Sequence, residues 1–77
     1  VRALSVEYVP SVHDASMATL HMVDKLGAAG GGYRYNYSLA ETARKVSDEW
    51  LDMPGLVALL ERLRPSGRSG DVYARLP

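Results

Sequence analysis

The stretch Tyr33-Arg-Tyr-Asn-Tyr-Ser-Leu-Ala-Glu41 carries two local signals that decide the expected fold. Its three tyrosines recur at every second position, which puts their rings on one face of an extended segment and predicts a short strand. Ser38 and Glu41 then form a capping box, which typically begins a helix. We therefore expect a helix directly after the strand, continued by residues at helical spacing: Leu39, Ala43, Val46 and Trp50.

The segments on either side of this stretch carry further strand and helix signals. Apolar and polar side chains alternate in residues 2–9 and again in residues 71–76, so a strand is expected near each end of the chain. Residues 11–27 predict a helix with an apolar stripe formed by Ala15, Ala18, Met22, Val23 and Leu26. A third helix is expected with Pro54 in its first turn, capped by Asp52 or begun at Met53, and with a buried stripe formed by Leu56, Val57, Leu60 and Leu63.

Composition is typical of one small domain, spanning residues 1–77. The chain has 77 residues and no cysteine, so disulfides do not stabilise it. A core of this size supplies only about 3–5 kcal/mol, and we therefore expect a homodimer. Two Lys against seven Arg, with no Ile or Phe, is a bias typical of GC-rich genomes and favours a bacterial or phage source. Without an export signal or a bilayer-length apolar run, a cytoplasmic location is expected.

No group of residues has the spacing of a catalytic or metal site. His13 and His21 are eight residues apart, which does not fit a two-histidine metal site, and both are expected to be solvated. The glycines of residues 27–32 follow a helix and precede tyrosines, so a linker is expected rather than a phosphate-binding loop. We expect no enzyme activity, no metal and no cofactor. The sequence leaves two roles open for the tyrosine rings, core packing or stacking of flat ligands.

Three segments together resemble the helices of winged helix-turn-helix DNA-binding regulators: residues 19–26, 38–46 and 56–63. Residues 33–37 would stand at that family's first short strand, and residues 66–76 at its wing. The resemblance implies a small α+β domain with three helices and a short antiparallel sheet. The long turn at residues 47–53 and a single wing strand depart from the family pattern. A ferredoxin-like arrangement containing a βαβ unit is the alternative fold.

The same resemblance implies binding to duplex DNA. Phosphate contacts would then come from Arg44, Lys45, Arg64 and Arg68, and Arg62 is the candidate for contacting a base. The leading hypothesis is a small bacterial or phage DNA-binding regulator that acts as a dimer. However, nine basic residues balance nine acidic ones, and the third expected helix is largely apolar. These features favour the competing hypothesis, a protein-protein interaction module or accessory subunit that does not bind DNA.

Overall fold

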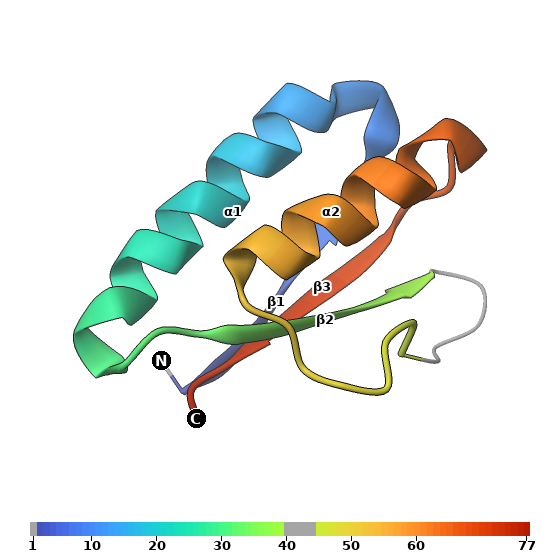
Figure 1. The fold of residues 1–77 in the computed structure, drawn as a ribbon. Coiled ribbons are helices and arrows are strands. Elements are labelled where there is room, and N and C mark those ends of the chain that lie inside the picture. Colours follow the sequence, from blue (N-terminus) through green and yellow to red (C-terminus); the bar gives the residue numbers. More distant parts are fainter. Residues whose placement is uncertain (1, 40–44) are drawn as a thin grey trace.

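A computed structural model describes residues 2–39 and 45–77 of the chain (Figure 1). Strand β1 (Ala3–Tyr8) leads through a 3-10 turn into helix α1 (His13–Gly27). After a second short turn come strand β2 (Arg34–Leu39), helix α2 (Met53–Leu63) and strand β3 (Gly70–Arg75). In the described part of the chain, neither helix is long and apolar enough to cross a membrane.

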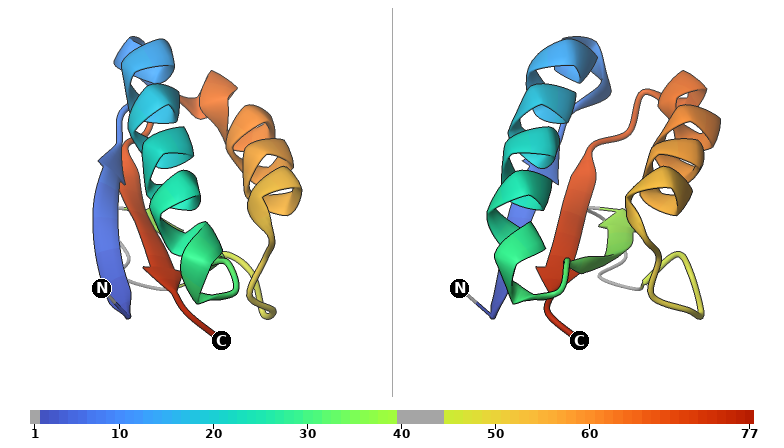
Figure 2. Two further views of the ribbon diagram at one scale, coloured as in Figure 1. Left: turned by 90° about the vertical axis from the view of Figure 1, so that its left-hand side faces the viewer. Right: turned by 60° about the vertical axis from the view of Figure 1, so that its left-hand side comes forward.

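The three strands form one antiparallel sheet in the order β1-β3-β2. Strand β3 lies in the centre and runs antiparallel to both neighbours, so β1 and β2 share a direction. Both helices lie on the same side of this sheet, α1 toward β1 and α2 toward β2 (Figure 2). One face of the sheet is therefore covered by helices.

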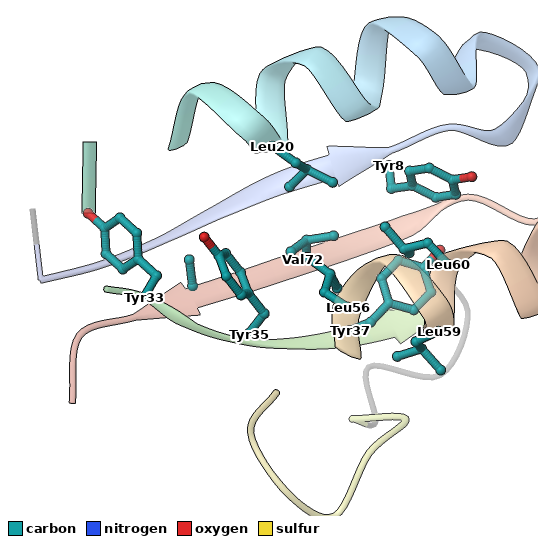
Figure 3. Close-up of a cluster of buried hydrophobic side chains, with 10 residues drawn as sticks. Tyr8, Leu20, Tyr33, Tyr35, Tyr37, Leu56, Leu59, Leu60 and Val72 are labelled. Atoms are coloured by element: carbon teal, nitrogen blue, oxygen red, sulfur yellow. The ribbon is translucent and has the colours of Figure 1, made fainter. Parts of the chain in front are cut away.

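The strand expected from the three alternating tyrosines is confirmed, and the tyrosine rings lie in the hydrophobic core. The side chains of Tyr33, Tyr35 and Tyr37 are at most 4% exposed, and they lie with Leu20, Leu56 and Val72 between the sheet and the helices (Figure 3). Tyr35 lies opposite Ala74 and Tyr37 opposite Val72 on β3, so the alternation of β2 matches that of the central strand. Core packing is thus the role that the structure selects for these rings.

The helix expected from Ser38 is wrong, and so is the three-helix fold that depends on it. Ser38 and Leu39 are the last residues of β2, and residues 45–52 contain no helix. The Ser38 hydroxyl does not cap a helix but lies 3.2 Å from the Tyr73 hydroxyl on β3. Ala43 and Arg44 lie outside the described residues. A helix cap contributes only about 1 kcal/mol, less than strand pairing over a buried face provides.

The ferredoxin-like alternative is wrong as well, although part of it is present. Strand β3 lies between β1 and β2, as in a split βαβ unit. In the described residues, however, helix α2 separates β2 from β3, where the ferredoxin-like order β-α-β-β-α-β has adjacent strands. The class is α+β, with two helices and a three-stranded antiparallel sheet among the described residues.

Both remaining helices were expected, but the buried face of α1 was not. Asp52 caps α2 through a hydrogen bond from the Gly55 amide at 2.9 Å, and Leu56, Leu59 and Leu60 are buried. Helix α1 instead buries Ser16, Leu20 and Gly27, while the expected stripe residues Ala15, Ala18, Met22 and Leu26 are exposed. Of the expected stripe, Val23 is half-buried and packs against the core, and the other four residues lie uncovered on the surface.

Candidate functional site

The sheet face opposite the helices carries polar and charged side chains in three rows across the strands. The registers place Ala3, Arg75 and Arg34 in a basic row, and Ser5, Tyr73 and Asn36 in a middle row. Glu7, Asp71 and Ser38 form an acidic row at the other end. Positive and negative charge are thus separated along one face, which we call the open face.

Residues 45–51 run along the outer edge of β2 and border the open face. The backbones of Tyr35 and Leu51 exchange two hydrogen bonds of 2.7 Å, and the Val46 amide donates to the Tyr37 carbonyl at 2.7 Å. Between these points, the side-chain amide of Asn36, in place of a backbone group of β2, makes two hydrogen bonds with the backbone of Ser47. Its Nδ2 donates to the Ser47 carbonyl at 2.8 Å, and its Oδ1 accepts from the Ser47 amide at 3.2 Å. The border segment is therefore held at three points.

This border segment brings Trp50 together with two cations. The Arg75 guanidinium lies 3.9 Å from the centre of the indole ring, and the Lys45 ammonium lies 5.8 Å from it. Both distances are in the range of cation-π contacts. Because Leu51 pairs with Tyr35 and packs on the core, its neighbour Trp50 is free to reach the open face. The indole is half-buried and the two cations are exposed.

An open cavity of about 470 Å³ lies between this cluster and the sheet. Its lining is formed by Ala3, Leu4, Ser5, Lys45, Trp50, Tyr73, Ala74 and Arg75. The half-buried Tyr73 ring belongs to the central strand, and its hydroxyl is oriented by Ser38. The site thus has an aromatic residue on the central strand, an aromatic residue on the border segment, and cations beside both.

The basic row is electrostatically unfavourable by itself. Arg34 and Arg75 are directly opposite each other on adjacent strands, and like charges in that position destabilise a sheet. Among the described residues, no carboxylate lies within ion-pair distance of Arg34, Arg75 or Lys45. A bound anion would relieve this repulsion, so the geometry favours an anionic ligand that also carries a flat ring.

The basic residues predicted from the sequence do not come together. Lys45 lies in the cluster, whereas Arg44 lies outside the described residues. Arg62 borders a separate groove that also contains Asp48 and Glu49. Arg64 lies 3.8 Å from Glu61, and Arg68 is exposed in the loop before β3. These positions do not form one phosphate-binding surface.

Sequence reasoning missed three residues that do converge: Trp50, Tyr73 and Arg75. Arg34 lies beside Arg75 in the strand register, but its Nη1 donates to the Tyr33 carbonyl at 3.4 Å. Strand alternation contained part of the signal, because it put Tyr73 and Arg75 on one face of the closing strand and Arg34 on the outer face of the tyrosine strand. Trp50 was assigned instead to a helix beginning at Ser38, and residues 45–52 contain no helix. The central position of β3 was also needed to join the two strands.

His13 is not the solvated side chain that was expected. It is half-buried, with Nδ1 at 2.7 Å from the Tyr8 hydroxyl and Nε2 at 3.2 Å from Glu61 Oε1. His21 is exposed. No group of three or more metal-ligating side chains occurs in residues 2–39 and 45–77. His13 therefore connects β1, α1 and α2.

Comparisons with protein-family models, curated proteins and solved structures find no match to this chain.

Proposed function

We propose that this protein binds single-stranded nucleic acid on the open face of its sheet. The observation that carries the proposal is the convergence of Trp50 and Tyr73 with Arg75 and Lys45 around one cavity. Single strands are bound by aromatic rings that stack on bases and by cations that contact the backbone. The open face offers both kinds of group on a rigid strand and its border segment.

Recognition of a single strand fits this surface better than recognition of a duplex. Base faces are accessible for stacking in a single strand, whereas a duplex hides them and exposes only their edges in the grooves. The duplex hypothesis depended on a recognition helix in a three-helix winged-helix fold, whereas the described residues contain two helices. A partly aromatic sheet surface is a recognised platform for unstacked bases.

The balanced charge of the chain limits the expected affinity. With nine charges of each sign, long-range attraction is weak, and binding must come from the local cluster. Contacts from Arg34, Lys45 and Arg75 would neutralise up to three phosphates. Each contact to a single strand contributes about −0.7 to the dependence of log affinity on log salt, so the expected slope is about −2.

The experiment uses the indole as a reporter. Trp50 is the single tryptophan, so its emission reports on this site alone. We expect a single-stranded DNA or RNA oligonucleotide to quench that emission and to gain anisotropy when labelled. Arg75→Ala should weaken binding on the order of tenfold, because it removes both a charge and a group that stacks on Trp50. Tyr73→Leu, which keeps apolar bulk but has no ring, should act in the same direction.

Arg68→Ala is the matched control, since it removes the same charge from an exposed position beyond the opposite end of β3. It should change affinity little. No quenching by oligonucleotides at low salt would refute the proposal and leave the interaction-module hypothesis in its place. The duplex hypothesis would be favoured instead if the protein bound duplex more tightly than single strands and if Arg75→Ala, Tyr73→Leu and Arg68→Ala weakened that binding equally.

A further inference from the structure

The outer edge of β1 offers unpaired backbone groups. In an antiparallel pair, hydrogen-bonded and non-hydrogen-bonded residues alternate. The Leu76 amide donates to the Arg2 carbonyl at 2.8 Å, so the even-numbered residues of β1 bond to β3. The amides and carbonyls of Ala3, Ser5 and Glu7 therefore point to the other side, where the described residues place no strand. No proline or lysine protects this edge within β1.

The flank of α1 beside this edge is apolar and exposed. Ser16, whose hydroxyl accepts from the Val9 amide, marks the flank toward β1. Within α1, helical spacing continues that side through exposed residues separated alternately by four and three positions: Ala15, Thr19, Met22 and Leu26. The exposed Val12 lies just before them, in the 3-10 turn that precedes α1. Alternate spacing of three and four is the pattern of a seam between packed helices. The charged or polar residues Asp14, His21 and Lys25 lie on the other flank.

These apolar side chains are far from buried. Val12 is 52% exposed, Met22 64% and Leu26 75%, and they account for three of the four large exposed hydrophobic residues in the described chain. Helix α1 packs beside β1 (Figure 2), and we call the edge of β1 together with this flank of α1 the β1–α1 side. Unpaired edge backbone can be extended by another strand, and an exposed apolar helix flank can be buried by another helix.

We propose that the β1–α1 side binds a second copy of this chain, with β1 pairing antiparallel to β1 of the other copy about a two-fold axis at Ser5. In this register Ser5 pairs with Ser5 and Ala3 with Glu7, all through outward-pointing groups. The two sheets become one continuous sheet, and both α1 helices lie antiparallel on the same face. Their apolar flanks then meet across the axis.

Charge complementarity selects both this register and this partner. With Glu7 opposite Ala3 of the second copy, the acidic row of each copy continues into the basic row of the other. The joined row reads Ser38, Asp71 and Glu7, followed by Ala3, Arg75 and Arg34 of the second copy. A shift by two residues would set Glu7 beside Ser5, or beyond the first residue of β1, and would break this match. The surface is thus complementary to itself in charge, spacing and direction.

The helix flank is tested by oligomeric state, measured without nucleic acid so that the result is independent of the proposed function. Sedimentation should give twice the 8.4 kDa mass of the chain for the wild type. Leu26→Glu should be monomeric with an unchanged far-UV spectrum. His21→Glu, the same new charge on the other flank, should remain dimeric. A monomeric wild type at about 100 µM, or a dimeric Leu26→Glu variant, would overturn the proposal.

The strand register is tested by single cysteines, which are unambiguous because the chain has none of its own. Two-fold pairing puts the Cα atoms of Ser5 and its copy about 5.5 Å apart, within disulfide range. Ala3 and its copy would be separated by four residues along the strands, about 13 Å. Under mild oxidation Ser5→Cys should form covalent dimers and Ala3→Cys should not. Equal cross-linking of both variants would contradict the register.

Discussion

Strand β2 carries two buried tyrosines with opposite hydroxyl surroundings, and their phenylalanine variants test the core. The Tyr35 and Tyr37 side chains are both 0% exposed. The Tyr35 hydroxyl donates to Asp24 Oδ1 at 2.7 Å. The Tyr37 hydroxyl is buried with no hydrogen-bond partner among the described residues. Burial raises the pKa of both hydroxyls, and beside Tyr35 the Asp24 carboxylate adds to the effect, so both stay protonated near neutral pH.

The two variants should therefore change stability in different directions. Tyr35→Phe removes a hydrogen bond to a charged group, which contributes about 1.5–3 kcal/mol, and we expect a loss near the lower end because Asp24 is partly exposed to water. Tyr37→Phe removes a buried hydroxyl whose lost hydration is not replaced, a cost of about 1–3 kcal/mol. Part of that gain is offset by the small void left behind. We expect Tyr37→Phe to be neutral or to stabilise by about 1 kcal/mol.

Urea unfolding followed by far-UV circular dichroism measures both free energies, and Trp50 emission gives a second probe of the same transition. The two variants differ from wild type by one oxygen each and lie two residues apart in one strand, so each is the control of the other. A Tyr37→Phe loss above about 1 kcal/mol, or equal losses in both variants, would refute the reasoning from unsatisfied burial.

Three further outcomes follow from the same packing. Burial raises the pKa values of Tyr8, Tyr35 and Tyr37, so as pH rises these hydroxyls ionise in the unfolded chain before they ionise in the folded one. The free energy of unfolding should therefore be constant up to about pH 10 and fall above it, which urea titrations at pH 8 and 10.8 measure. Gly70→Ala should cost about 3 kcal/mol or prevent folding, because the new methyl group would meet the Ser38 carbonyl and the Tyr37 ring; thermal melts check this. Asn36→Ala should cost about 1–3 kcal/mol and shift Trp50 emission to the red, because it detaches Ser47 from β2.

Local sequence signals determined most of the elements of this protein. Alternation in residues 2–9, 33–37 and 71–76 gave three strands, because a strand shows its two faces at every second residue regardless of its neighbours. The helix ending at Gly27 and the helix capped by Asp52 were equally local, since spacing and capping act within one or two turns. Of the candidate site, only Lys45 was identified from the sequence.

Tertiary structure decided where local signals competed and where distant segments met. Ser38 belongs to a capping-box pattern but does not begin a helix. It pairs with Asp71 in the sheet, as Leu39 pairs with Gly70, and strand pairing over a buried face stabilises the chain more than one helix cap does. The order β1-β3-β2 set Arg34 beside Arg75, and the border segment set Trp50 over Arg75, contacts between residues 25 to 41 positions apart that no local pattern contains. Three residues of the exposed flank of α1, Ala15, Met22 and Leu26, were recognised in the sequence as part of an apolar stripe. Only the structure places them on the surface beside a free strand edge, because α1 packs on the core through Leu20 and Val23 instead.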